Sequence, residues 1–330
     1  ILGGEAGYLG GKFRNGKGEY VVCEADESDG TFRKLNPLYA VVTNIDREHL
    51  EHYSNFEDLV MANKTFIENI KEGGCLLTSY DDPRMSGLLK DYPKRFLTYS
   101  LSDDKADIRA ENIRMDKSRT LFEAVFKGKE LGLFELNIPG RHNVENSLAA
   151  ILLGLELGVD MRIIKEGLSR YKGTLRRFEV KGEIDDIMVV EDYAHHPREL
   201  RATIAACRNW RPRRLIGVFQ PHRYTRTKYL KEEFGRSFLE LDHLILTDIY
   251  SASEKPIEGI STKLIYDEAV KNGQRDALLL QRSEILSHLL KTLRSGDIVL
   301  VLGAGDIGEL SDEIVKALRV KGQAFAQRTV

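Results

Sequence analysis

The second half of the chain alternates regularly between short apolar runs and amphipathic segments. Runs rich in Val, Ile and Leu predict strands at 187–192, 214–219, 243–249, 277–281 and 297–302. Apolar residues at helical spacing predict helices near 198–209, 227–240, 262–271 and 283–294, with a last helix after residue 306. Such alternation is typical of an α/β domain whose mostly parallel sheet is covered by helices on both faces.

The first half predicts a mixed α/β arrangement. Short β-branched runs predict buried strands at 19–25, 39–45 and 75–79, and looser alternation predicts β structure over 107–137. Helices are predicted at 56–70, 143–159 and 161–171. The pattern changes near "GTLRRFEV", so we expect one domain over 1–178 and a second over 179–330.

Composition narrows the class of protein. The 330 residues carry 49 basic and 51 acidic side chains, a formal charge of −2, with both signs spread along the chain. This balance argues against a nucleic-acid or membrane-surface protein. The three cysteines are far apart and lack metal or redox spacing, which indicates a reducing compartment. With no apolar stretch of membrane length and no signal peptide, we expect a cytoplasmic protein.

Two polar segments of the first half follow predicted strands. In "CEADESDG" (23–30), Glu24 and its acidic neighbours lie at the end of the first predicted strand, where hard oxygen ligands would suit Mg²⁺. A solvated acidic turn is the alternative interpretation. His49, in "TNIDREHLEHY", follows the next strand, and it would share a rim with Glu24 if the two strands are neighbours.

A third segment, "IPGRHNVENS" (138–147), opens a strongly predicted helix. Asn143 and Asn146 are three residues apart and share one face of its first turns, with His142 just before them. Such side chains can read a nucleotide base, or they can simply cap the helix.

The second half places polar side chains where strands meet helices. The adjacent arginines of "GTLRRFE" are candidates for binding phosphate oxygens. The segment "EDYAHHPREL" then sets Asp192, Tyr193, His195 and His196 before a helix that has Pro197 in its first turn. In "FQPHRYTRTKYL", a strand end is followed by His222, Arg223 and Arg226, which form a candidate anion site.

The segment "VLVLGAGDIGEL" raises a different possibility. Gly303, Gly305 and Gly308 have the spacing of a dinucleotide-binding turn, as in a nicotinamide oxidoreductase. That fold expects an acidic residue about 20 positions later, but 321–330 contain no Asp or Glu. Only 22 residues follow Gly308, too few for a further helix and strand. A turn that offers backbone N–H groups to a substrate, or one that is merely tight, is the better interpretation.

Together these motifs resemble one family, the Mur ligases of peptidoglycan synthesis. The segments "EADESDGTF", "VTNIDREHLEHY", "DDP", "IPGRHNVENSLAA", "GTLRRFE", "DYAHHPREL", "FQPHRYTRT", "DIYSASEKPI" and "GAGDIG" follow the family's order and approximate spacing. "DESD", "HHP" and "FQPHRYTRT" are most similar to the alanine-adding branch. The resemblance implies a central ATP-binding domain, a Rossmann-like C-terminal domain and an N-terminal domain for a UDP-sugar. It also implies that ATP, with Mg²⁺, phosphorylates UDP-N-acetylmuramate and that L-alanine attacks the acyl phosphate.

The resemblance further implies residue roles. Glu24 and His49 would hold Mg²⁺. Lys64 lies 15 positions after His49, where several relatives carry a carbamylated lysine at the metal, but a helix-surface lysine is the better interpretation here. The residues implied to contact ATP are His142, Asn143 and Asn146 at the adenine and Arg177 and Asp192 at the phosphate and ribose. Those implied to line the place where alanine meets the muramyl carboxylate are Tyr193, His195, His222, Arg223 and Arg226.

One departure from the family concerns the glycine-rich phosphate loop, which ends in Gly-Lys-Thr. The Gly-Lys pairs of this chain are followed by Phe13, Gly18 and Glu130, and none has the required Ser or Thr. We therefore expect that the chain starts just beyond that loop, that an N-terminal segment is missing, and that the chain is inactive by itself. A non-catalytic nucleotide or amino-acid binding module is the alternative.

Overall fold

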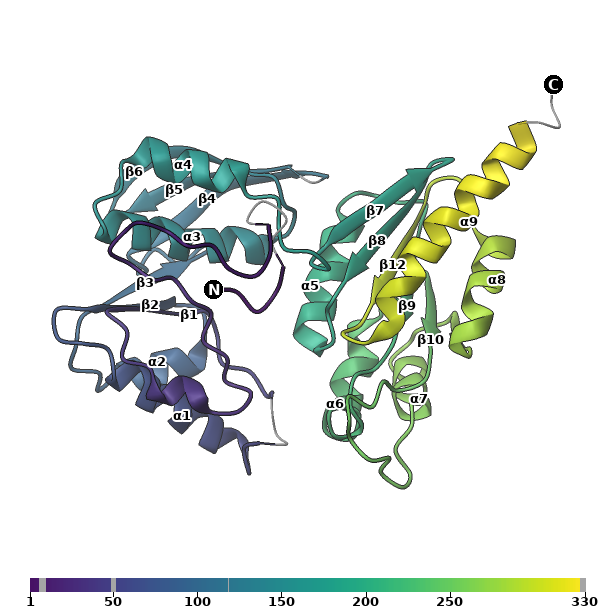
Figure 1. Cartoon of the computed structure of the whole chain (residues 1–330), viewed down its shortest axis with the longest axis horizontal. Coiled ribbons are helices and arrows are strands. Elements are labelled where there is room, and N and C mark those ends of the chain that lie inside the picture. Colours follow the sequence, from purple (N-terminus) through teal and green to yellow (C-terminus); the bar gives the residue numbers. More distant parts are fainter. Residues whose placement is uncertain (6–9, 49–51, 118, 327–330) are drawn as a thin grey trace. The chain divides into compact units, whose positions relative to one another are not determined.

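A computed structural model describes residues 1–5, 10–48, 52–117 and 119–326. The chain divides into two compact units, Ile1–Lys172 and Gly173–Val330 (Figure 1). The segment "GTLRRFE" therefore belongs to the second unit.

The first unit is built on a sheet with the strand order β1-β2-β3-β4-β5-β6. The parallel part comprises β1 (Tyr39–Val42), β2 (Cys75–Ser79), β3 (Phe96–Ser100) and the start of β4 (Ile108–Asp116). Antiparallel hairpins then add β5 (Arg119–Phe126) and β6 (Lys129–Leu136). Two apolar clusters pack the helices of this unit against its sheet. One packs α1 (Phe56–Glu68) and α2 (Pro83–Leu89), and the other packs α3 (Arg141–Glu156) and α4 (Met161–Arg170).

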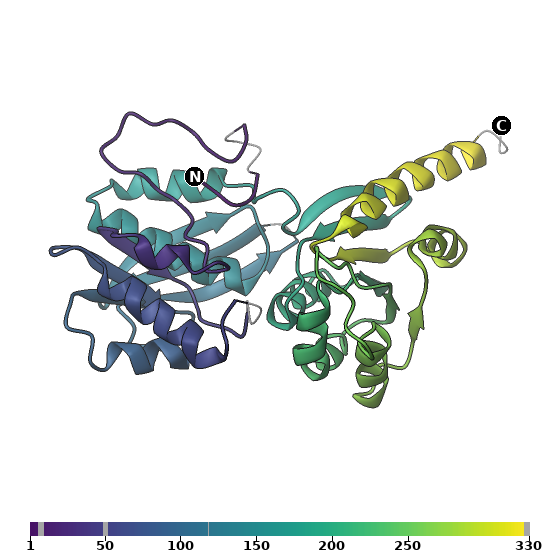
Figure 2. The same ribbon diagram turned by 60° about the horizontal axis from the view of Figure 1, so that its bottom comes forward.

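The predicted strand at 19–25 is wrong. Figures 1 and 2 draw this segment as irregular chain, and β1 forms the edge of the sheet instead. Tyr20, Val21 and Val22 are 54%, 82% and 70% exposed. A β-branched run has strand propensity, but it becomes a strand only where a neighbouring strand takes up its backbone hydrogen bonds. In consequence, Glu24 does not lie at the end of a strand.

The second unit confirms the predicted parallel sheet, with the order β11-β10-β9-β12-β8-β7. Its parallel strands are β8 (Ile187–Asp192), β9 (Arg214–Phe219), β10 (His243–Leu246), β11 (Ala277–Leu279) and β12 (Asp297–Leu302). The edge strand β7 (Glu179–Ile184), absent from the sequence prediction, runs antiparallel to β8. The sequence prediction also missed β3 and α2. It ended the strand predicted at 243–249 three residues beyond the end of β10.

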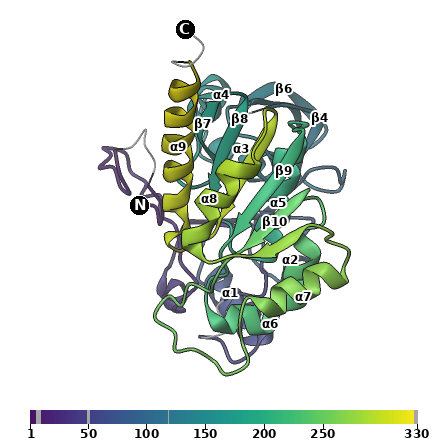
Figure 3. The same cartoon turned by 90° about the vertical axis from the view of Figure 1, so that its right-hand side faces the viewer.

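Helices cover both faces of this second sheet, as predicted. One apolar cluster packs α5 (Pro197–Arg208), α6 (Tyr224–Ser237) and α7 (Lys263–Lys271) against alternate strand residues such as Leu215 and Leu300. The other packs α8 (Arg282–Thr292) and α9 (Glu309–Ala326) against the intervening residues, such as Ile216 and Val299 (Figure 3). Strands buried on both faces explain the nearly continuous apolar runs in the sequence. Among the described residues, no helix is both long and apolar enough to cross a membrane.

The register of the sheet places three loops side by side. Leu302 of β12 pairs with Asp192 of β8 on one side and with Phe219 of β9 on the other. All three strands therefore end at the same level, and the chain leaves the sheet at neighbouring points. This edge, formed by the carboxyl ends of parallel strands, is where open α/β sheets bind ligands.

Candidate active-site residues

Hydrogen bonds join the three loops into one platform in the second unit. Gly303 N–H donates to Asp192 O at 3.1 Å, and Gln220 N–H donates to Leu302 O at 3.0 Å. The Gln220 side chain also donates to Asp306 Oδ1 at 2.8 Å and accepts from Ile307 N–H at 3.3 Å. Side chains that project from this platform are thus held by a fixed backbone.

The hydrogen bonds of His195 assign its tautomer. Its Nδ1 lies 2.9 Å from Tyr193 O and 3.5 Å from Glu199 Oε2, and both oxygens are acceptors, so Nδ1 carries the proton. Burial lowers the pKa of His195 to about 4, with Arg226 and Arg177 acting in the same direction and Glu199 opposing them. At neutral pH this imidazole is therefore uncharged, and its Nε2 is a hydrogen-bond acceptor.

His222 is assigned the opposite tautomer by Arg226. Arg226 Nη1 lies 3.1 Å from His222 Nδ1, and a guanidinium can only donate, so Nδ1 accepts and Nε2 carries the proton. The His222 ring stacks on Tyr250, with centroids 5.7 Å apart, and lies 5.5 Å from the ring of His195. Two neutral imidazoles therefore lie side by side, one assigned as an acceptor and the other as a donor.

Tyr193 and Arg223 complete this group. The guanidinium groups of Arg176 and Arg177 lie 5.0 and 5.3 Å from the Tyr193 ring centroid, within cation–π range. Arg223, the N-cap of α6, has a positive φ of 73°, and its N–H donates to Tyr250 O at 2.8 Å. The second unit thus brings together Tyr193, His195, His222, Arg223 and Arg226, all of which the sequence had singled out.

Glu199 is a residue that sequence reasoning missed. One carboxylate oxygen accepts from the N–H groups of His195 and His196 at 3.0 and 3.1 Å, and the other accepts from Arg177 Nη1 at 2.9 Å. Burial opposes its ionisation, but the charge that His195 gains in acid, the charge of Arg177 and these hydrogen bonds outweigh burial and lower the pKa to about 2. The available signal was a glutamate three residues after the helix N-cap, the spacing of a capping box.

We expect Glu199→Gln to lower the pKa of His195 further. The carboxylate of Glu199 raises that pKa against the effect of burial, so its removal leaves an imidazole that takes up a proton only at lower pH. An NMR titration of the His195 ring signals measures the change. Glu232→Gln, an exposed change on α6, is the control. A His195 ring that titrates at the same pH with and without the Glu199 carboxylate would contradict the prediction.

The buried carboxylate of Asp192 makes its hydrogen bonds to groups of the second unit. Its carboxylate accepts from Phe178 N–H, Ala194 N–H and Thr203 Oγ1 at 3.1, 2.8 and 2.9 Å, and the residue is only 6% exposed. Burial raises its pKa to about 6, although Arg177 and these hydrogen bonds pull the other way. Asp192 thus ties the start of β7, the loop after β8 and α5 to one another. Arg177, in contrast, is half-exposed at its side chain.

The glycine turn after β12 is filled by side chains of its own unit. A Cβ on Gly305 would lie 2.4 Å from Gln220 Oε1 and 2.6 Å from Tyr250 Cγ, and one on Gly308 would lie 2.3 Å from Glu191 Oε1. Gly303 adopts φ +146°, and a Cβ there would lie 3.0 Å from Gln220 O. These close approaches explain the glycine spacing without a dinucleotide and weigh against the oxidoreductase interpretation.

The first unit holds the remaining candidates. Glu24 is exposed, and one of its oxygens accepts from Gly3 N–H at 2.7 Å. His49 lies outside the described residues, so the predicted pair with Glu24 cannot be placed. Lys64 is a half-exposed helix residue that pairs with Glu68 at 3.4 Å. Within the described part of the chain, no group of three or more His, Cys, Asp or Glu side chains could hold a metal ion.

The three candidate adenine contacts share the start of α3. The helix is preceded by Gly140, which makes no side-chain cap. Asn143 Nδ2 donates to Pro139 O at 2.6 Å, so this side chain bonds the segment before the helix rather than capping an N–H group. His142 is half-buried and Asn146 is exposed on the next turn.

Comparison with known proteins agrees with this architecture. The profile of the Mur ligase middle domain matches residues 9–154, and that of the Mur ligase glutamate ligase domain matches 176–305. The UDP-N-acetylmuramate–L-alanine ligase of Pelotomaculum thermopropionicum is 43% identical over 97% of this chain and 69% of its own length. The ligase of the same name from Geotalea daltonii is 45% identical over 97% of this chain and 70% of its own length.

Solved structures show the same fold. The crystal structure of UDP-N-acetylmuramate–alanine ligase from Thermotoga maritima has a TM-score of 0.79 at 27% identity, covering 97% of this chain and 69% of that one. A MurF ligase from T. maritima in complex with ADP has a TM-score of 0.69 at 20% identity, covering 88% and 65%. The identity of the curated relatives and the length that they share lead to one conclusion. The chain belongs to the Mur ligase family, with the UDP-N-acetylmuramate–L-alanine ligases.

Proposed function

We propose that this chain supplies the ATP-handling and amino-acid-handling parts of a ligase that joins L-alanine to the carboxylate of UDP-N-acetylmuramate. The observation that carries the proposal is the group formed by His195, His222 and Arg226 beyond the carboxyl ends of β8 and β9, the two strands that flank β12. It offers an acceptor, a donor and a cation close together. Those are the groups needed to recognise a zwitterionic amino acid.

The tautomers suggest how alanine would be held. His195 Nε2, as an acceptor, would take a hydrogen bond from the α-ammonium group of alanine. His222 Nε2–H and the Arg226 guanidinium would donate to its carboxylate. Because both imidazoles are neutral, the positive charge that faces this carboxylate would come mainly from arginine.

The reaction in this proposal has two steps. An oxygen of the muramyl carboxylate attacks the γ-phosphorus of ATP, which gives an acyl phosphate and ADP. The amine of alanine, after losing a proton to solvent, attacks the acyl carbon. The nitrogen of the tetrahedral intermediate loses a second proton to solvent, and the intermediate then collapses to the amide and releases phosphate. Arginine side chains at the meeting point would offset the negative charge that builds up in both steps.

Nucleotide and metal binding would involve the first unit. His142, Asn143 and Asn146 would face the adenine from α3. Glu24 presents an exposed carboxylate, a hard oxygen donor that suits Mg²⁺. This fits an ion held by one or two protein groups together with substrate phosphates. When bound, Mg²⁺ neutralises phosphate charge and orients the γ-phosphoryl group.

We expect the 330 residues by themselves to release no phosphate from ATP beyond the protein-free rate. They contain no Gly-Lys-Ser or Gly-Lys-Thr, so backbone N–H groups and a lysine for the β- and γ-phosphates have to come from elsewhere. The test compares this chain with a fusion, here called the completed ligase. In it, the upstream segment of the P. thermopropionicum relative, including the phosphate loop implied by the family, is joined to Ile1.

Phosphate release is measured with ATP, UDP-N-acetylmuramate and L-alanine together and with each substrate omitted. The proposal expects release from the completed ligase only when all three are present. Release by the unfused chain would contradict the expected inactivity. A completed ligase that folds but shows no dependence on alanine would overturn the proposed function.

A further inference from the structure

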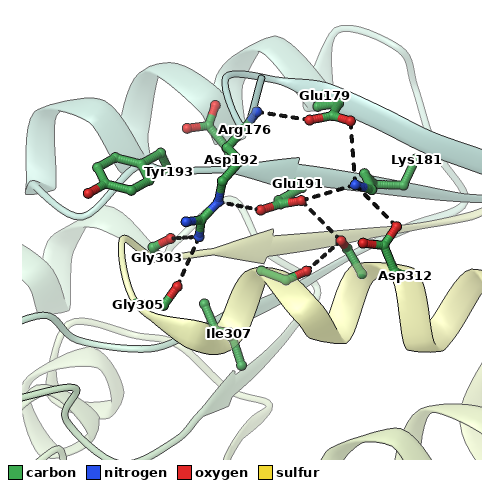
Figure 4. A network of polar contacts seen from close by, with 12 residues as sticks. Arg176, Glu179, Lys181, Glu191, Asp192, Tyr193, Gly303, Gly305, Ile307 and Asp312 are labelled. Atoms are coloured by element: carbon green, nitrogen blue, oxygen red, sulfur yellow. Dashed lines mark hydrogen bonds and ion pairs between the residues drawn. The ribbon is translucent and has the colours of Figure 1, made fainter. Parts of the chain in front are cut away.

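Glu191, next to the last residue of β8, joins three segments of the second unit (Figure 4). Its side chain is only 4% exposed. Oε1 accepts from Arg176 Nε at 2.6 Å, while Oε2 accepts from Ser311 Oγ at 3.1 Å and lies 3.5 Å from Lys181 Nζ. A buried carboxylate without these partners would be strongly disfavoured, so the contacts act as a unit.

Arg176 extends this network to the glycine turn. Its Nη2 donates to Gly303 O and Gly305 O at 3.2 and 3.0 Å. Its own backbone is also held, because its N–H donates to Glu179 Oε2 at 2.8 Å and its carbonyl accepts from Tyr193 N–H at 2.6 Å. Arg176 thus contacts both the turn and the residue whose ring it faces.

The two adjacent arginines have different surroundings. Arg176 uses Nε and Nη2 on groups of its own unit, whereas Arg177 makes one ion pair, with Glu199, and its side chain is 49% exposed. A phosphate-binding arginine needs its planar donors directed at the ligand. The geometry of Arg176 directs them at the glycine turn instead.

Holding the two carbonyl groups also orients two N–H groups. In a trans peptide, the C=O of one residue and the N–H of the next point in opposite directions. Since Gly303 O and Gly305 O face Arg176, the N–H groups of Ala304 and Asp306 point away from it. Arg176 therefore fixes the direction in which the turn offers backbone donors.

We propose that Arg176, anchored by Glu191, is a positioning residue that sets the glycine turn and the Tyr193 ring for ligation. The proposal rests on the proposed function for its consequence in catalysis. The positioning itself is a property of the chain without substrate, so it can be tested separately.

The test uses Arg176→Met, with Arg208→Met as a matched control. Arg208 pairs with Asp242 at 2.9 Å at the opposite end of the sheet. Amide hydrogen exchange over 303–308 and the NMR chemical shifts of the Tyr193 ring are measured for each variant, together with global unfolding by urea. Arg176→Met should speed exchange of the turn amides by about tenfold or more and shift the Tyr193 signals. Arg208→Met should leave both nearly unchanged.

Arg176→Lys tests the geometry and covers the case in which Arg176→Met fails to fold. Lysine keeps the charge beside Glu191, but it cannot reproduce the planar pair of donors, so the turn amides should still exchange faster than in the unmodified chain. The positioning role is overturned if both folded variants keep the exchange rates and the Tyr193 shifts. It is also overturned if Arg208→Met changes them equally. A completed ligase without alanine-dependent activity would count against the proposed function and leave the exchange result intact.

Discussion

Arg226→Ala is expected to lower the kcat/KM of the completed ligase for L-alanine by about 10²–10³-fold, the size of effect seen when one charged or oriented donor is removed from a developing charge. Arg226 supplies a guanidinium to the proposed carboxylate site and, through the 3.1 Å contact with Nδ1, selects the tautomer of His222. Its loss would remove a cation and free His222 to adopt the wrong tautomer. The measurement is steady-state phosphate release against alanine concentration.

Arg236→Ala is the matched control for this prediction. Arg236 is an exposed arginine in the last turn of the same helix, α6, so its removal changes the net charge equally without touching the proposed site. Its kcat/KM should stay within about twofold of the unmodified enzyme. If both variants lose activity to the same extent, the effect of Arg226 is one of overall charge and the site assignment fails.

Phe219→Ala is expected to destabilise the second unit by about 3–5 kcal/mol, the usual cost of emptying a buried aromatic position. Phe219 is fully buried, and its ring lies 5.4 and 5.3 Å from those of Phe234 and Phe238. No smaller side chain can fill that space without moving α6. Urea unfolding of the isolated chain measures the loss directly.

Tyr229→Ala, on the exposed side of α6, provides the comparison. This side chain is 54% exposed, so its removal should change stability by less than about 0.5 kcal/mol. Since Phe219 also ends β9, just before the loop that carries His222, its loss should weaken the completed ligase as well. A Phe219 variant as stable as the Tyr229 variant would show that the cluster is not a tightly packed core.

Much of the second unit could be predicted from the sequence. The predicted bounds of the strands at 187–192, 214–219 and 297–302 coincide with β8, β9 and β12. These strands are buried on both faces, so their residues are mostly apolar, and charged residues occur only at their ends. The same runs located the loops that carry Tyr193, His222 and Gly303.

Elsewhere the local sequence pattern predicted the wrong element or predicted none. The run at 19–25 has as much strand propensity as β1 but no neighbouring strand to bond with. Strand β7 lies at a sheet edge and has only half-buried and exposed residues, so its apolar signal is weak. Glu191 looked like an ordinary charged residue, because its partners Arg176 and Ser311 are distant along the chain. The sequence marked Arg176 only as a phosphate candidate, and its contacts with Gly303 and Gly305 were hidden for the same reason.

By itself, the sequence determined the alternation of strands and helices, the loops that carry the candidate site residues and, through the order of its motifs, the family. Those features depend on residues that are close along the chain. Only the tertiary structure decided how the polar groups are used. It buries Asp192 and makes Nε2 of His195 an acceptor and Nε2 of His222 a donor. It also directs the guanidinium of Arg176 at the glycine turn. Burial and hydrogen-bond partners set these states, and both arise only when distant segments pack together.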